Sequence, residues 1–216
     1  MENLLGSMKE NIQTLSLGTV LNDSDHGEKI IKIDFNLNDE QGNYVRADHD
    51  ELLMPHWKEF AAALRHWSEY HANGDCLEVV AINSIELPKS VLDILRPAFE
   101  ESRIETVFFD NSHHTGRMVG FVKNVLQRNH FVTKLGFYEI KFSQEGVKSL
   151  CDAIKLRNAE GQFIKYLALA NCFEHGIDTH TLKMILTSIA SGSATAVVVL
   201  DLRSNGMSSR EAAVIA

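Results

Sequence analysis

The sequence predicts an α/β solenoid, with a curved parallel sheet inside, helices outside and an N-terminal cap of an antiparallel β-meander plus one helix. Three observations lead to this prediction. Five segments with alternating apolar residues recur along residues 77–216, a helical apolar stripe follows each segment, and residues 1–76 show a different pattern. Self-similarity at a period of about 20 to 50 residues is typical of stacked repeat units.

Residues 1–76 are predicted to form the N-terminal cap. Residues 12–21 and 29–37 alternate apolar with polar side chains, as half-buried strands do, and residues 44–49 are suited to a third strand. Asn, Asp and Gly, which favour turns, lie between them. A helix is predicted at residues 55–72, where one apolar stripe is formed by Trp57, Phe60, Ala61, Leu64 and Trp67.

The five repeated segments align without gaps. They begin at spacings of 27, 28, 32 and 33 residues, with first positions at Leu77, Ile104, Val132, Ile164 and Val197. Positions four and six of each segment are apolar, and side chains alternate across a strand. We therefore expect these two positions to face the helices and positions three, five and seven to point out from the sheet. Residues 77–216 are interpreted as about five such units in a single continuous structural unit.

The repeat resembles the leucine-rich repeat, and its long units with a full helix resemble the ribonuclease-inhibitor-like subclass. The last segment fits best, since Leu200, Leu202, Asn205 and Met207 occupy the motif's apolar and Asn positions. Cys172 occupies the same Asn or Cys position one unit earlier. The first three units carry Ile85, Ser112 and Ile140 there, which predicts a less regular turn after their strands.

Composition points to a globular protein without a nucleic-acid-binding face. The net charge is −8, basic residues are spread along the chain, and 44% of residues are hydrophobic. No secretory leader is recognised at the N-terminus, and no run approaches the ~18 apolar residues of a membrane helix. Cys76, Cys151 and Cys172 are too few and too widely spaced for a disulfide framework, which favours a reducing, cytoplasmic location.

No catalytic motif is found, and we expect a protein without metal or cofactor that is not an enzyme. Cys172 is interpreted as a packed thiol in the repeat's turn. His113 and His114 form the one histidine pair that suits loop chemistry, so the alternative is a hydrolase or metal-dependent enzyme using them.

The favoured function is a protein–protein interaction module that binds through the concave sheet and its adjoining loops. Three aromatic side chains are expected on neighbouring strands, and Gly136, Ala168 and Ala170 beside them are expected to leave room for a partner. The alternatives are that the aromatics only shield one another, or that the chain is a structural fragment of a longer repeat protein. The predicted partner-binding residues are Phe108, Asp110, Lys134, Tyr138, Tyr166, Asp201 and Arg203.

The last unit is predicted to leave its outer side open. Asn205 and Gly206 suit a turn, and Ser208 or Ser209 is placed to cap a short helix. No polar covering unit follows, although the end of a solenoid requires one. We therefore expect this side to be a point of truncation or a docking edge, with self-association as one possible use.

Overall fold

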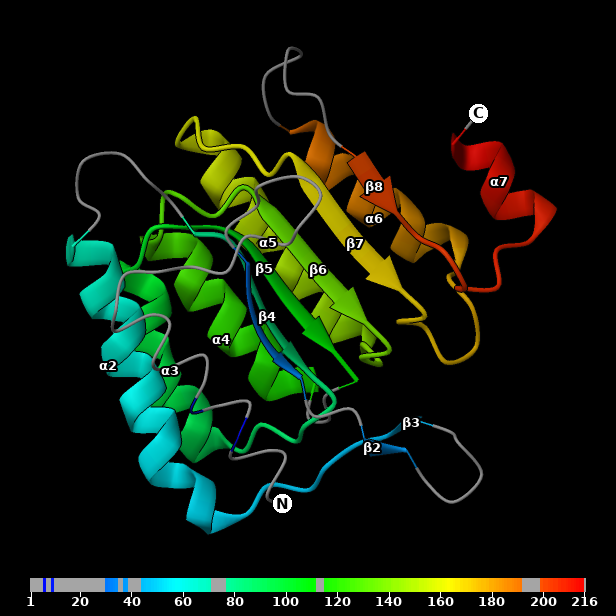
Figure 1. The fold of residues 1–216 in the computed structure, drawn as a ribbon. Helices are drawn as coiled ribbons and strands as arrows, with labels where there is room; N and C mark the ends of the chain where they lie inside the picture. Colours follow the sequence, from blue (N-terminus) through cyan, green and yellow to red (C-terminus); the bar gives the residue numbers. More distant parts are fainter. Residues whose placement is uncertain are drawn as a thin grey trace.

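A computed structural model describes Gly6, Lys9 and residues 30–34, 37–38, 44–70, 77–111, 115–191 and 199–215. Six parallel strands form one sheet, in which every strand lies beside the next one along the chain (Figure 1). The strands, in their order across the sheet, are β1 Ile30–Asp34, β4 Leu77–Asn83, β5 Ile104–Asp110, β6 Lys134–Tyr138, β7 Tyr166–Ala170 and β8 Val199–Asp201.

Helices follow the strands and cover one face of the sheet (Figure 1). Each helix packs on the next, from α2 to α7. The bounds are α2 Met54–Tyr70, α3 Lys89–Glu101, α4 Thr115–Arg128, α5 Gln144–Ala159, α6 Thr179–Ala190 and α7 Ser209–Ile215, with a 3₁₀ turn η1 at Glu51–Leu53. The prediction of an α/β fold with a parallel sheet is confirmed, and the order of elements is compatible with a solenoid.

The predicted N-terminal meander is not seen. Residues 30–34 form β1, which pairs parallel with β4 and extends the main sheet. Ile31 and Ile33 of β1 are buried in the same rows as the apolar residues of β4, and this burial favours the parallel position. The antiparallel pairing that is seen joins only β2 (Leu37–Asn38) to β3 (Tyr44–Val45). Residues 12–21 lie outside the described residues.

The predicted helix at residues 55–72 corresponds to α2. Trp57 and Phe60 are fully buried, and their rings meet edge to face with centroids 6.3 Å apart. Pro55 lies in the first turn, where a missing N–H costs no hydrogen bond. The side chain of Trp67 lies outside the described residues. This helix packs along α3 and supplies the first part of the core.

The gapless alignment of the repeats is reproduced in the strand pairing. Across the sheet, position four forms one row of neighbours and position six forms a second row. Both rows belong to the continuous hydrophobic core under the helices. The first row consists of Val80, Val107, Leu135 and Leu167, with the partly buried Leu200 packed against the core, and the second of Ile82, Phe109, Phe137 and Leu169. Leu202, just after β8, is buried in the same core.

The first residue of the turn has the same conformation in all five units, which corrects the expectation of a less regular turn after the first and third strands of the repeat. The residue at position eight has a left-handed backbone in all five, with φ between 47° and 59°. Its N–H donates to the carbonyl of position seven in the following unit, over 2.9–3.0 Å at four successive junctions. The turn therefore depends on backbone geometry, and Ile85 and Ile140 do not disturb it. The five residues are Ser84, Asn111, Glu139, Asn171 and Ser204.

Asn205 and Cys172 add side-chain hydrogen bonds to the last two turns. The Asn205 side chain accepts from the N–H of Cys172 at 2.7 Å and of Phe173 at 3.2 Å, and it donates to the Leu202 carbonyl at 2.9 Å. The Cys172 thiol donates to two carbonyls, those of Phe137 and Ala170, each at 3.3 Å. Burial raises the pKa of Cys172 to about 12, so the group is a packed thiol, as the sequence indicated.

Buried polar side chains connect α3, α4 and α5 each to the helix before it. Ser102, Asn129 and Arg157 each lie twenty-five residues after the first residue of their units. The Ser102 hydroxyl donates to the Leu64 carbonyl inside α2, and the Asn129 side chain donates to the carbonyls of Phe99 and Ser102 at the end of α3. The bond from Asn129 to Phe99 satisfies a carbonyl in the last turn of α3, where carbonyls have no partner within the helix.

Arg157 makes the most extensive of these connections. Its guanidinium donates to four carbonyls at the end of α4 and in the loop that follows, at residues 126, 129, 130 and 132. The side chain is 2% exposed, and this burial lowers its pKa to about 10. The guanidinium is therefore charged at neutral pH, and charged donors form the stronger class of hydrogen bond.

The Arg157→Leu variant is expected to lose about 3 kcal/mol of unfolding free energy, because four carbonyls lose charged donors in a buried place. Urea unfolding measures the loss. Arg128→Leu is the matched control, since that side chain is 73% exposed and its removal should change stability by about 0.5 kcal/mol or less. Equal effects of the two substitutions would show that the buried hydrogen bonds do not stabilise the fold.

The start of α7 is capped by Ser208, one of the two serines predicted for this role. The Ser208 hydroxyl accepts from the Arg210 N–H, and the Glu211 carboxylate accepts from the Ser208 N–H and hydroxyl. The arrangement resembles a capping box, except that the Ser208 hydroxyl meets the N–H of the second helical residue instead of the third. Glu211 also accepts from the Thr179 hydroxyl of α6 at 2.6 Å, so the same carboxylate connects α7 to its neighbour.

Stability is expected to fall on acidification because of Glu211. Hydrogen bonds from Ser208 and then Thr179 lower its pKa from 4.5 to about 2. A carboxylate with a lowered pKa stabilises the folded state above its unfolded pKa, and this contribution is lost as the pH falls towards about 2. An NMR titration of the Glu211 carboxyl carbon should give a midpoint near 2. Glu211→Gln should remove this part of the pH dependence, and a midpoint near 4.5 would contradict the assignment.

Candidate partner-binding face

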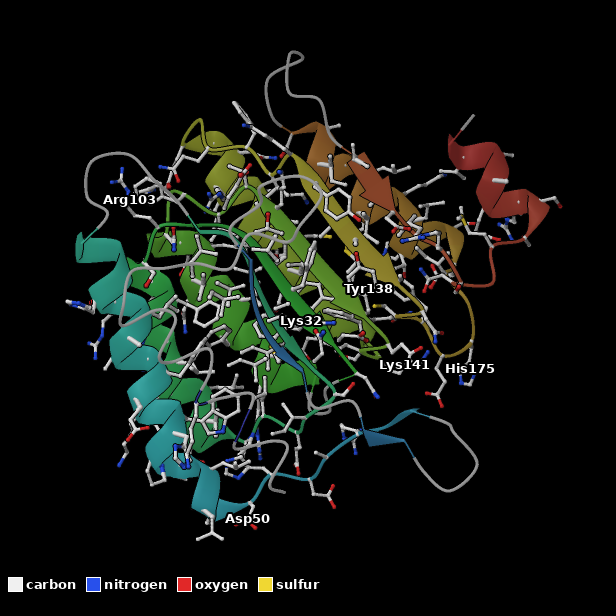
Figure 2. The ribbon with its side chains drawn as sticks, viewed as in Figure 1. Lys32, Asp50, Arg103, Tyr138, Lys141 and His175 are labelled. Carbon is white, nitrogen blue, oxygen red and sulfur yellow. The ribbon has the colours of Figure 1, made fainter. Side chains whose placement is uncertain are left out.

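The face of the sheet opposite the helices carries the predicted site, and we call it the open face. It is formed by the side chains at positions three, five and seven of the strands. Figure 2 shows Tyr138 of β6 on this face, with Lys141 towards the carboxyl ends of the strands. The helices position these side chains indirectly. Positions four and six of each strand pack under the helices, so positions three, five and seven have to point to the opposite face.

Three aromatic side chains form one cluster on the open face. The Phe108 ring meets Tyr138 and Tyr166 edge to face, with centroids 5.7 and 6.3 Å apart. The hydroxyls of Tyr138 and Tyr166 lie 3.4 Å from each other. All three side chains are half-buried. Their edge-to-face contacts join side chains of three neighbouring strands into one aromatic surface.

The small residues beside the cluster do not leave the space that the sequence predicted. A Cβ on Gly136 would lie 2.2 Å from Cδ1 and 2.5 Å from Cε1 of Phe108, so this ring lies directly on the glycine. Ala168 is fully buried and Ala170 is 9% exposed. The prediction of room at these positions was wrong. Mutual shielding of the aromatic rings, the alternative interpretation, describes this part of the face.

A hydrogen-bonded chain joins the aromatic cluster to the charged pair on β8. Asp201 accepts from the Arg203 guanidinium at 2.7 to 3.0 Å and from its backbone N–H at 3.0 Å. These bonds, and a further one from the Tyr166 hydroxyl, lower the pKa of Asp201. Burial, and then the hydrogen bond with the Tyr166 hydroxyl, raise the pKa of Tyr138. The two tyrosine hydroxyls and the Asp201 carboxylate therefore form one connected polar group.

The remaining two predicted residues lie at opposite ends of the strands. Lys134, at the start of β6, makes an ion pair with Glu105 at 3.1 Å. Asp110, at the end of β5, lines a hollow of about 290 Å³ together with Tyr138 and Arg203. The structure thus brings six of the seven predicted residues into one continuous region and leaves Lys134 paired at the far end.

Sequence reasoning missed three residues that line the hollow, namely Glu139, Asn171 and Ser204. All three occupy position eight, where the left-handed turn directs them to the carboxyl ends of the strands. Asn is enriched in this conformation and is found here in two of the five units, which is the signal that the sequence offered. Lys141 adds a neighbouring charge by donating to the Asn171 carbonyl and side chain at 2.8 Å.

His113 and His114 lie outside the described residues. Within the described part of the chain, no three His, Cys, Asp or Glu side chains are grouped so as to hold a metal ion. In the same residues, no helix has both the length and the apolar character to cross a membrane.

Comparison with known proteins found no matching family model and no matching curated protein.

Replacing Gly136 by Ala is expected to displace the Phe108 ring and to lower the unfolding free energy by about 1–3 kcal/mol, the usual cost of overpacking. Urea unfolding measures the change, and the aromatic NMR signals of Phe108 and Tyr138 report the displacement. Gly120→Ala is the control, because nothing lies within 4 Å of a Cβ there and α4 should gain up to about 1 kcal/mol. Unchanged aromatic signals in Gly136→Ala would contradict the close packing.

Proposed function

We propose that this chain is a non-catalytic leucine-rich-repeat protein, of the ribonuclease-inhibitor-like kind, that binds another protein through its open face and the loops at the carboxyl ends of its strands. The observation that carries the proposal is the ordered cluster of Phe108, Tyr138 and Tyr166, joined by hydrogen bonds to Asp201 and Arg203. Tyrosine and arginine held in place are typical of the residues that dominate binding energy.

The regular units support the family part of the proposal. Five strands of one pattern pair in register, and each is followed by the same left-handed turn. Asn205 and Cys172 donate to backbone carbonyls in equivalent turns, which is a reason for either residue to occupy this position. Free, buried Cys151 and Cys172 agree with the proposed cytoplasmic location.

The carboxyl ends of the strands have to contribute to the interface. The face of five strands offers only about 400 Å², from strands ~4.8 Å apart and ~15 Å of exposed length. A stable interface usually buries about 800 Å² on each partner. The hollow beside Tyr138 and Arg203 and the turn residues around it extend the face in this direction. We place the partner's main contacts across Tyr138 for this reason.

Affinity capture with the whole chain tests the proposal. A partner recovered with the wild type should bind the Phe108→Ala/Tyr138→Ala variant about 30-fold more weakly, since losing such anchors costs about 2 kcal/mol or more. Glu139→Lys tests the hollow without altering the aromatic packing, and Lys148→Glu on the exposed surface of α5 is the matched charge control. Unchanged urea midpoints would show that the variants are folded.

Recovery of every partner at wild-type levels by both open-face variants would contradict the proposal. Equal weakening by Lys148→Glu would place the interface on the helices instead.

A further inference from the structure

Asn205 and Gly206, in the turn that follows β8, form an Asn-Gly pair, in which an asparagine side chain readily loses its amide. The Gly206 nitrogen attacks Cγ of Asn205, a succinimide ring closes, and the amide nitrogen leaves as ammonia with the proton of Gly206. Water then opens the ring to aspartate or isoaspartate. Glycine favours the reaction because it has no side chain to hinder its backbone nitrogen. The rate therefore depends on how the turn holds the Asn205 side chain.

The Asn205 side chain makes every hydrogen bond that an amide can make. Its oxygen accepts from the N–H of Cys172 at 2.7 Å and of Phe173 at 3.2 Å. Its nitrogen donates to the carbonyl of Leu169 and, at 2.9 Å, to that of Leu202. Two donors and two lone pairs are the full capacity of this group. The residue is 2% exposed, so the amide is bonded on both atoms and shielded from water.

The backbone around this amide is also packed. The Asn205 carbonyl accepts from the N–H of Ile177 at 2.9 Å. A Cβ on Gly176 would lie 3.1 Å from the Gly206 carbonyl oxygen and 3.3 Å from that of Asn205, so the loop after β7 lies directly on the turn. Departure of the amide nitrogen breaks both bonds that it donates. The reaction therefore requires this turn to open first.

The products of the reaction do not restore the closed turn. Aspartate has an oxygen where asparagine has its NH₂ group, and a carboxylate oxygen accepts hydrogen bonds but donates none. That oxygen would face the carbonyl oxygens of Leu169 and Leu202, so two buried acceptors lose their donor and a negative charge is placed beside them. Isoaspartate also lengthens the backbone by one carbon. Either product therefore disfavours the contact between the units of β7 and β8.

We propose that Asn205 is a deamidation site that the closed turn suppresses and that, once modified, weakens the junction between the units of β7 and β8. In the folded chain the reaction proceeds at the rate of the open turn multiplied by the fraction of time that the turn is open. A chain that has opened for long enough to react is then marked irreversibly. This site goes beyond the proposed binding function, because it needs no partner and no residue of the open face.

Mass spectrometry of tryptic peptides measures the amide loss after the whole chain is incubated at mildly alkaline pH, with and without denaturing urea. Loss at Asn205 is expected to be about ten-fold or more slower in the folded chain than in urea. Asn73 and Gly74, the other Asn-Gly pair of the sequence, lie outside the described residues and give an internal reference. In urea the two pairs should react at similar rates. Equal rates at Asn205 with and without urea would overturn the proposal, and so would absence of the reaction in urea.

The Asn205→Asp variant tests the second part of the proposal, because it carries a reaction product from the start. Hydrogen exchange at the amides of Cys172, Phe173 and Ile177 is expected to become about ten-fold or more faster. Asn171→Asp is the matched control, since that side chain accepts from Lys141 at 2.8 Å through an oxygen that aspartate retains.

Unchanged exchange in Asn205→Asp, or an equal effect of the two substitutions, would overturn the weakening of the junction. Loss of the folded state in Asn205→Asp alone would support it. The mass measurement uses the unaltered chain, so a folding defect of the variant cannot imitate the suppression of the reaction.

Discussion

The fold depends on one backbone hydrogen bond that recurs at each junction between units, from the N–H of position eight to the carbonyl of position seven in the next unit. The bond needs a left-handed residue directly after the strand, and five side chains other than glycine adopt this conformation. Non-glycine residues rarely do so, because Cβ crowds the backbone. The repeated bond therefore outweighs a repeated conformational cost, and it fixes how far each unit is shifted against its neighbour.

Register then determines the core. A shift of one residue would move every apolar side chain of a strand to the other face of the sheet. With the register fixed, positions four and six form unbroken rows under the helices. The helices need a further connection, because packed helices lie ~8–10 Å apart and parallel strands only ~4.8 Å. Ser102, Asn129 and Arg157 supply it with side chains that reach back to the preceding helix.

The sequence was sufficient for the repeated part of the fold, because alternation on strands and the helical stripe are local patterns. The sequence was not sufficient to predict how β1 pairs, because apolar and polar residues alternate in the same way in an antiparallel meander and at the edge of a parallel sheet. Only the match of Ile31 and Ile33 to the rows of β4 distinguishes the two, and that match depends on long-range contact. The turns were misjudged for a related reason. The prediction relied on the side chain at position nine, whereas the conformation at position eight is what recurs.

On the open face too, local sequence patterns predict which residues lie there but not which contacts their side chains make. The alternation of side chains correctly predicted that Phe108, Tyr138 and Tyr166 lie on neighbouring strands. It did not predict the direction in which each ring points. Because Gly136 has no Cβ, the Phe108 ring can lie directly over the glycine, where it contacts both tyrosine rings. Shielding and recognition are then not exclusive. The contacts that cover the sheet also hold the two tyrosine hydroxyls next to Asp201, which is paired with Arg203. A partner that engages the exposed Arg203 would act on the Asp201 carboxylate, and through it on the aromatic cluster.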